Sequence, residues 1–205
     1  MGYPQHVVLD ANGVLYQVGD DIHELFIPFL RAHGCTLSEA EVVAAYRECS
    51  LGRFDSAELW RRCGMQQNLD AKYLPLYQPH AGVFPFLRRA KAAGLGVAVL
   101  TNDVAAWSAW VAPALGFTAW IDHWVNSSVA GARKPDAAVY HALAAATGWA
   151  LADCLFVDDR SPNLDAAATL GMQTAFMPSD DKSGPGGHRV VATFDDLAAL
   201  VFPPA

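Results

Sequence analysis

Polar clusters rich in oxygen donors follow three separate apolar segments of the chain. The clusters consist of Asp10, Asn12, Thr101, Asn102, Asp158 and Asp159, and Lys134 stands apart from them just before Pro135. Carboxylate oxygens are the hard ligands that Mg²⁺ prefers, whereas an ammonium and small donors neutralise the oxygens of a phosphoryl group. Together these side chains predict a site for a magnesium ion and a phosphoryl group.

The segments that carry the clusters have the pattern of a parallel α/β sheet. Short apolar runs predict strands at residues 6–9, 96–100, 120–125, 154–157 and 174–177, and helical patterns lie at 83–93, 104–115, 135–147 and 162–170. Alternating strands and helices are typical of a parallel sheet, in which ligands bind at the carboxyl ends of the strands. We therefore expect the polar clusters to converge, although they lie far apart in the sequence.

Residues 20–77 have a different, purely helical pattern. Apolar side chains recur on one helical face from Ile22 onward, Ser38 and Glu41 have the spacing of a capping box, and a further helix is predicted from Asp55 or Ser56 to Gly64. The pattern predicts an all-helical insertion at residues 17–78. The fold class is then α/β, with a parallel-sheet core formed by residues 1–16 and 79–205 and a small all-helical insertion after the first strand.

Composition restricts the class of protein and its partners. With 53% hydrophobic and 17% charged residues among 205, the chain is expected to fold, and its apolar runs are too short to span a membrane. The formal charge of −7 argues against a nucleic-acid binder and favours a small-molecule substrate. Residues 1–5 show no signal-peptide pattern, and the four cysteines lack disulfide or zinc spacing. We expect a cytoplasmic monomer or homodimer with free thiols.

Four segments of the chain resemble the successive motifs of the haloacid dehalogenase superfamily. They read V-V-L-D-A-N-G-V-L, V-L-T-N, R-K-P-D-x-x-x-Y and L-F-V-D-D-x-x-x-N-x-x-x-A-x-x-L-G-M, and they span nearly the whole chain. The resemblance implies a Rossmann-like core with a helical cap, which coincides with the insertion predicted from the residues. The segment L-G-R-F-D-S-A-E-L-W at residues 51–60 is similar to a cap segment of the subgroup that includes the phosphatase domain of soluble epoxide hydrolase and glucose-1-phosphate phosphatases.

The resemblance also implies roles for individual residues. Asp10 is expected to attack phosphorus and form an aspartyl-phosphate that water then hydrolyses. Mg²⁺ would be held by Asp10, the backbone carbonyl of Asn12 and one or both of Asp158 and Asp159, with Asp159 favoured as the direct ligand. The phosphoryl group would be held by Thr101, the Asn102 backbone and Lys134. Asn163 is expected to orient the metal shell or Lys134, and the side chains expected to meet the substrate are Arg53, Arg47 and Tyr46.

Asn12 departs from the family pattern, because most of its phosphatases carry an acid/base Asp at this position. An amide exchanges no proton near neutral pH, so assistance worth about 10²–10⁴-fold is expected to be missing. Three explanations stay open. In the first, the substrate is an acyl or anomeric phosphate whose leaving group needs little protonation. In the second, another residue, for example from the cap, acts as the general acid/base. In the third, the protein binds phosphate without catalysis, by nature or through an engineered Asp→Asn replacement.

A metal-independent 2-haloacid dehalogenase is the alternative chemistry on the same fold. Members of that branch usually have an aromatic residue at the position of Asn12 and lack the paired acids of the fourth motif. Asp158 and Asp159 therefore favour the magnesium-dependent branch. The expected function is hydrolysis of a small phosphorylated metabolite.

Overall fold

A six-stranded sheet forms the centre of the protein, and all of its strand pairs are parallel. The computed structural model describes residues 3–179 and 184–202. In spatial order the strands are β3 (His123–Asn126), β2 (Gly96–Thr101), β1 (His6–Leu9), β4 (Cys154–Asp158), β5 (Gln173–Phe176) and β6 (Arg189–Val190). The parallel α/β core expected from the sequence is confirmed, because β1 lies between β2 and β4 and aligns the three polar clusters at one edge.

Helices cover both faces of the sheet and make three layers. Successive residues of β1 point to opposite faces, so Val7 and Leu9 belong to one apolar cluster and Val8 to another. The first cluster includes residues of α5 (Val83–Ala92), α6 (Ala105–Ala114) and α10 (Phe194–Val201); the second includes residues of α8 (Ala137–Thr147) and α9 (Ser161–Thr169). Burial on both faces explains why the strands are continuous apolar runs.

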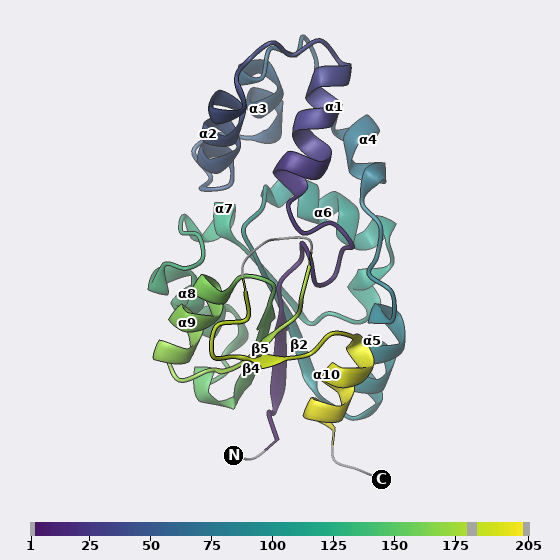
Figure 1. The fold of residues 1–205 in the computed structure, drawn as a ribbon, viewed down its shortest axis with the longest axis vertical. Helices are drawn as coiled ribbons and strands as arrows, with labels where there is room; N and C mark the ends of the chain where they lie inside the picture. Colours follow the sequence, from purple (N-terminus) through teal and green to yellow (C-terminus); the bar gives the residue numbers. More distant parts are fainter. Residues whose placement is uncertain (1–2, 180–183, 203–205) are drawn as a thin grey trace.

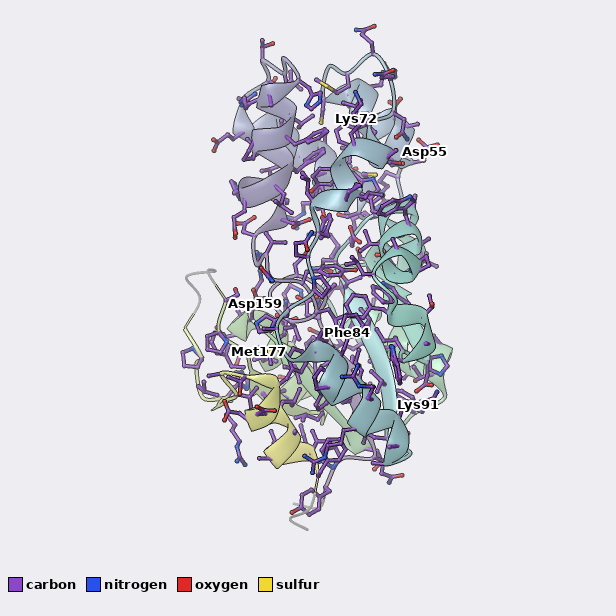
Figure 2. The ribbon with its side chains drawn as sticks, turned by 90° about the vertical axis from the view of Figure 1, so that its right-hand side faces the viewer. Asp55, Lys72, Phe84, Lys91, Asp159 and Met177 are labelled. Atoms are coloured by element: carbon purple, nitrogen blue, oxygen red, sulfur yellow. The ribbon has the colours of Figure 1, made fainter. Side chains whose placement is uncertain are left out.

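The chain between β1 and α5 is largely helical and lies beyond the sheet end toward which β1 runs (Figure 1). It contains a π-helical turn (Ile22–Phe26), α1 (Ile27–Ala32), α2 (Glu39–Cys49), α3 (Ser56–Arg62), α4 (Asp70–Tyr73) and a 3-10 turn (Leu74–Leu76). The Ser38–Glu41 capping box starts α2, and the Asp55 side chain caps α3, as predicted. Figure 2 shows Asp55 and Lys72 at this helical end of the molecule and Asp159 near its junction with the sheet.

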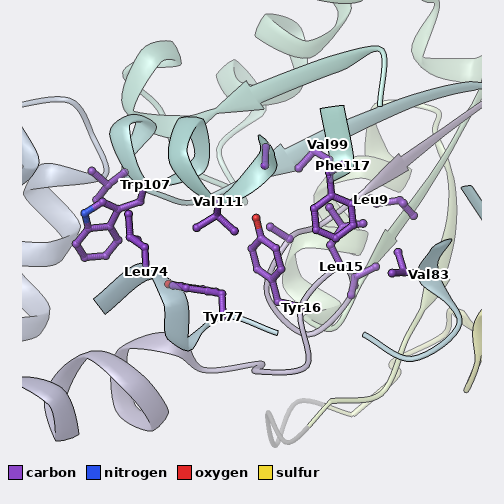
Figure 3. Packing of buried hydrophobic residues seen from close by; sticks show 14 of the residues in the cluster. Leu9, Leu15, Tyr16, Leu74, Tyr77, Val83, Val99, Trp107, Val111 and Phe117 are labelled. Atoms are coloured by element: carbon purple, nitrogen blue, oxygen red, sulfur yellow. The ribbon is translucent and has the colours of Figure 1, made fainter. Parts of the chain in front are cut away.

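Aromatic packing fixes the helical segment against the rest of the protein. The Phe26 ring makes edge contacts with Trp60, Tyr73 and Trp107, with centroids 5.3–5.4 Å apart, and Trp107 belongs to α6. The indole nitrogens of Trp60 and Trp107 each donate to Asp70 Oδ1 at 2.6 Å. Tyr16 continues this packing into the core, lying between Tyr77 and Phe117 (Figure 3).

Four elements differ from the sequence prediction or go beyond it. The third strand begins at His123 rather than at residue 120, because a 3-10 turn (Phe117–Ala119) occupies the chain just before it. The short strand β6 and the helices α7 (Ser127–Ala130) and α10 were not predicted. The sequence also predicts a mobile, glycine-rich loop at residues 180–187, of which residues 180–183 lie outside the described part of the chain. Among the described residues, none of the helices is long and apolar enough to cross a bilayer.

Candidate active site

Asp10 and Lys134 form a buried ion pair at the carboxyl end of the sheet. Asp10 follows β1 directly, and its backbone amide donates to the Val157 carbonyl at 2.9 Å, which ties the end of β1 to β4. Lys134 Nζ lies 2.7 Å from Asp10 Oδ1, and the Ala11 amide donates to the same oxygen at 2.7 Å. This carboxylate is therefore held in one orientation by two donors.

Lys134 reaches the site because its own backbone is clamped. The Asn102 side chain accepts from the Lys134 amide at 2.8 Å and donates to the Lys134 carbonyl at 3.0 Å. Nζ also donates to the Leu100 carbonyl at 2.8 Å and lies 2.7 Å from Asp158 Oδ2. The Lys134 side chain is 1% exposed. Its charge is therefore directed at two carboxylates in an environment that screens it poorly.

Three carboxylates meet around this lysine. Asp10, Asp158 and Asp159 each offer an oxygen, and these oxygens lie within 4.8 Å of one another. Burial raises the pKa of Asp10 to about 6, although the Lys134 charge opposes the shift. Burial, followed by the charges of Asp10 and Asp158, raises the pKa of Asp159 to about 8. One ammonium does not compensate three buried carboxylates, so the residues present fit a divalent cation with oxygen ligands.

The two adjacent acids differ in how they are held. Both Asp158 oxygens are engaged by donors, namely Lys134 Nζ at 2.7 Å, the Arg160 amide at 2.8 Å and Asn163 Nδ2 at 3.0 and 3.1 Å. Asp159 Oδ2 accepts from Ser179 Oγ at 2.5 Å. Asn163 thus orients the Asp158 carboxylate. The prediction that Asn163 orients the metal shell or Lys134 stays a prediction.

The turn after β1 leaves room for the Asp159 carboxylate. Gly13 has φ +77°, and a Cβ at this position would overlap Asp159 Oδ2. A Cβ at Gly19 would come within 2.5 Å of Ser179 Oγ and 3.2 Å of Asp159 Oδ2. Glycine is therefore required here by its permitted φ and by the close approach of the carboxylate.

A pocket of about 230 Å³ opens over these groups. Five residues predicted for the site line it, namely Asp10, Asn12, Thr101, Asn102 and Lys134, and Asn163 joins them. Asn12 Oδ1 and Thr101 Oγ1 are buried and have no hydrogen-bond partner within the described residues. Buried polar atoms without a partner are rare, and these two are available to a group bound in the pocket.

The helical segment supplies part of the pocket wall, although not with every residue predicted. The sequence predicts that Tyr46 and Arg47 meet the substrate, and both line the pocket. Arg53 does not; it is exposed in the turn between α2 and α3. Asp158 and Asp159 are 0% and 1% exposed and are not among the residues that line the pocket.

Sequence reasoning missed Asp21, Arg133 and Arg160, which also line the pocket. Asp21 Oδ2 accepts from Tyr46 at 2.9 Å and from Tyr77 at 3.2 Å, and burial raises its pKa. A signal was available for Arg133, which directly precedes Lys134 in the R-K-P segment. Arg160 had a similar signal, because it directly follows Asp158 and Asp159. Asp21 had no local signal, since its position depends on how the helical segment packs.

Three curated proteins that are similar to parts of this chain are named as phosphatases or as a nucleotidase. Phosphatase MT3486 of Mycobacterium tuberculosis is 33% identical over 132 residues, which cover 63% of this chain and 58% of that protein. Enolase-phosphatase E1 of Gluconacetobacter diazotrophicus is 33% identical over 57% of this chain and 51% of its own length. GMP/IMP nucleotidase YrfG of Escherichia coli is 34% identical over 49% of this chain and 45% of its length. The chain thus spans about half the length of these relatives.

Solved structures share the fold over most of their length. The HAD family enzyme BT-2542 of Bacteroides thetaiotaomicron, in complex with magnesium and inorganic phosphate, aligns with a TM-score of 0.72 at 17% identity, covering 88% of this chain and 97% of that chain. L-2-haloacid dehalogenase of Xanthobacter autotrophicus aligns with a TM-score of 0.70 at 16% identity, covering 97% of this chain and 98% of that chain. The family model of haloacid dehalogenase-like hydrolases matches residues 4–171. The chain belongs to the haloacid dehalogenase-like hydrolase family.

Proposed function

We propose that this protein is a Mg²⁺-dependent phosphate monoester hydrolase that acts through an aspartyl-phosphate at Asp10. The observation that carries the proposal is the Asp10 carboxylate at the pocket, held 2.7 Å from Lys134 among three carboxylates. The phosphatase and nucleotidase names of the relatives support a small phosphorylated metabolite as the substrate.

The reaction has two displacements at phosphorus. In the first, an Asp10 oxygen forms a bond to phosphorus and the bond to the leaving oxygen breaks. In the second, water attacks the aspartyl-phosphate, releases inorganic phosphate and restores Asp10. Thr101 Oγ1, which lacks a hydrogen-bond partner among the described residues, donates to a phosphoryl oxygen, as does the Asn102 amide. Lys134 offsets negative charge on the nucleophile and on the phosphoryl group.

The metal ligands we propose are Asp10, the Asn12 backbone carbonyl and Asp159, with Asp158 acting through water. Lys134, Asn163 and the Arg160 amide donate to the Asp158 oxygens, which supports a water-mediated contact between this acid and the metal. When bound, Mg²⁺ supplies positive charge to the phosphoryl oxygens and lowers the repulsion between nucleophile and substrate.

Asn12 limits the leaving groups that this site can expel quickly. An amide cannot protonate a departing alkoxide, so we propose a substrate whose leaving group needs little protonation, such as an acyl or anomeric phosphate. The narrower resemblance to glucose-1-phosphate phosphatases stays a prediction and is compatible with this choice.

We also propose that residues 17–78 act as a cap on a core formed by residues 1–16 and 79–205. Asp21, Tyr46 and Arg47 line the pocket from this segment, whereas the groups assigned to phosphoryl transfer come from the core. The cap then determines substrate preference. The four cysteines are free and buried, which supports the cytoplasm as the compartment in which the protein acts.

The test is a panel of aryl, acyl and sugar phosphates with magnesium titrated from zero to millimolar, with 2-chloropropionate as a control. We expect magnesium-dependent phosphate release that Asp10→Asn abolishes and that Asp195→Asn, at an exposed position, leaves intact. Halide release without magnesium would identify a dehalogenase. Phosphate binding without turnover of any ester would identify a non-catalytic protein.

A further inference from the structure

A second pocket, of about 370 Å³, adjoins the phosphoryl pocket and is strongly cationic. Four of its eight lining residues are Arg or Lys, namely Arg47, Arg133, Lys134 and Arg160. The whole chain has only 14 such residues among 205, at a net charge of −7. No Asp or Glu belongs to the lining within the part of the chain that the structure describes. Such a concentration of positive charge attracts an anion.

Arg133 is the central cation of this pocket and is incompletely paired. Its guanidinium donates to Ser50 Oγ, and it forms no ion pair within residues 3–179 and 184–202. Its pKa is lowered first by burial, and the nearby Arg47 charge also lowers it. Arg133 is half-buried, whereas Arg47 is exposed. An anion that lies between the two guanidinium groups offsets their mutual repulsion.

Neutralisation of nearby buried acids explains the position of Arg133 less well than binding of an anion does. The charges of Asp21 and Asp103 raise the pKa of Arg133, but both acids accept hydrogen bonds from other residues. Asp21 accepts from two tyrosine hydroxyls, and Asp103 accepts from Ser108 Oγ at 2.5 Å and from the Val104 amide at 2.6 Å. Arg133 therefore retains donors that these acids do not use.

The cationic pocket is continuous with the phosphoryl site. Asn102, Lys134 and Asn163 line both pockets, as do the three arginines. A ligand whose phosphoryl group lies between Asp10 and Thr101 thus extends toward Arg47 and Arg133 without leaving the protein. Guanidinium groups match the oxygen geometry of carboxylates and phosphates, whereas a neutral hydroxyl leaves them uncompensated.

We infer that Arg47 and Arg133 form a subsite for a second anionic group of the substrate, a carboxylate or a second phosphate. The inference rests on the proposed function for its assignment of the phosphoryl end. The substrate class it names is a small phosphate ester with two separated anionic groups.

The test measures equilibrium binding, so that it gives a result whether or not the protein turns over an ester. Three non-hydrolysable benzylphosphonates that differ only at the meta position carry a carboxylate, a neutral carboxamide or a second phosphonate. Their dissociation constants are measured by calorimetry with millimolar magnesium on the wild type, Arg47→Gln, Arg133→Gln and, as a matched control, Arg88→Gln. Arg88 is exposed on α5 and lines neither pocket.

We expect one anionic compound to bind the wild type about 10- to 100-fold more tightly than the carboxamide, the range for charge-assisted hydrogen bonds. Which one binds better identifies the second group as carboxylate or phosphate. The ratio of the carboxamide's dissociation constant to that of the tighter anionic compound should fall toward one in Arg47→Gln and Arg133→Gln. It should keep its wild-type value in Arg88→Gln. Equal binding of the three compounds by the wild type would overturn the inference. So would equal weakening of all three in the arginine variants, because the arginines would then hold the phosphoryl end. Hydrolysis of 4-nitrophenyl phosphate, measured separately, tests the proposed function.

Discussion

Replacing Lys134 by methionine tests the electrostatic account of the site, because this ammonium is the charge that compensates two buried carboxylates. Nζ lies 2.7 Å from both Asp10 and Asp158, whose side chains are 10% and 0% exposed. Removing one partner of a buried pair leaves an uncompensated charge and costs about 3–5 kcal/mol. For a chain of this size each kcal/mol shifts the melting temperature by about 2–4 °C, so Lys134→Met should melt about 6–20 °C lower.

The pH dependence of that loss has a definite sign. Without Lys134 the folded-state pKa of Asp10, already raised to about 6, rises further above its ordinary value of 3.8. A raised pKa means that the folded state binds the proton more tightly, so stability is present at low pH and is lost as pH rises through the folded-state pKa. The stability deficit of Lys134→Met should thus be smaller at about pH 5 than at about pH 8, and magnesium should recover part of it.

Thermal and urea unfolding in the absence of metal measure this prediction. The matched control is Lys91→Met, since Lys91 is 55% exposed and lies 3.3 Å from Asp122. An exposed pair of this kind contributes about 0.2–1 kcal/mol. Equal destabilisation by the two substitutions, or a deficit that grows as pH falls, would refute the account of a charge-compensating lysine.

Three further predictions concern the metal, a buried acid and the missing general acid. Magnesium at a hundredfold excess over its dissociation constant should stabilise the protein by about 2.7 kcal/mol, and Asp159→Asn should abolish most of this shift; an unchanged melting temperature would contradict the metal assignment. Burial raises the pKa of Asp103 to about 7 from 3.8, so its ionisation destabilises the folded state above that pH. Asp103→Asn should therefore raise the melting temperature at about pH 8 more than at about pH 5, and a decrease at about pH 8 would contradict this. Asn12→Asp should accelerate the hydrolysis of a primary sugar phosphate far more than that of an aryl phosphate in steady-state assays. Equal acceleration of the two reactions would show that Asn12 does not stand at the position of a missing general acid.

The strand-end residues could be predicted from the sequence because their positions follow from local pattern. Asp10, Thr101 and Asp158 come at or after buried apolar strands, and parallel pairing places such positions at one sheet edge whatever the details of packing. The capping box at Ser38 was equally local. The Thr193 capping box before α10 offered the same kind of signal and was not used.

Contacts that depend on the packing of the helical segment could not be predicted in this way. Arg47 and Arg53 are six residues apart, yet only Arg47 lines the pocket, because it lies in the last turn of α2 and Arg53 follows the end of that helix. The position of Asp21 depends on Tyr46 and Tyr77, which are 25 and 56 residues away in the sequence. The strand β6 has two exposed residues and therefore no apolar periodicity to detect.

Chemical trapping of the intermediate tests the central claim, that Asp10 is the nucleophile, most directly. The protein is mixed with magnesium and a rapidly turned-over aryl phosphate, quenched in acid and treated with borohydride, which reduces an acyl phosphate to an alcohol. Peptide mass spectrometry then locates the reduced residue. Our account predicts homoserine at position 10 in the wild type and no reduction at that position in Asp10→Asn. Turnover with an unmodified Asp10, or a phosphoryl group found on another side chain, would contradict it.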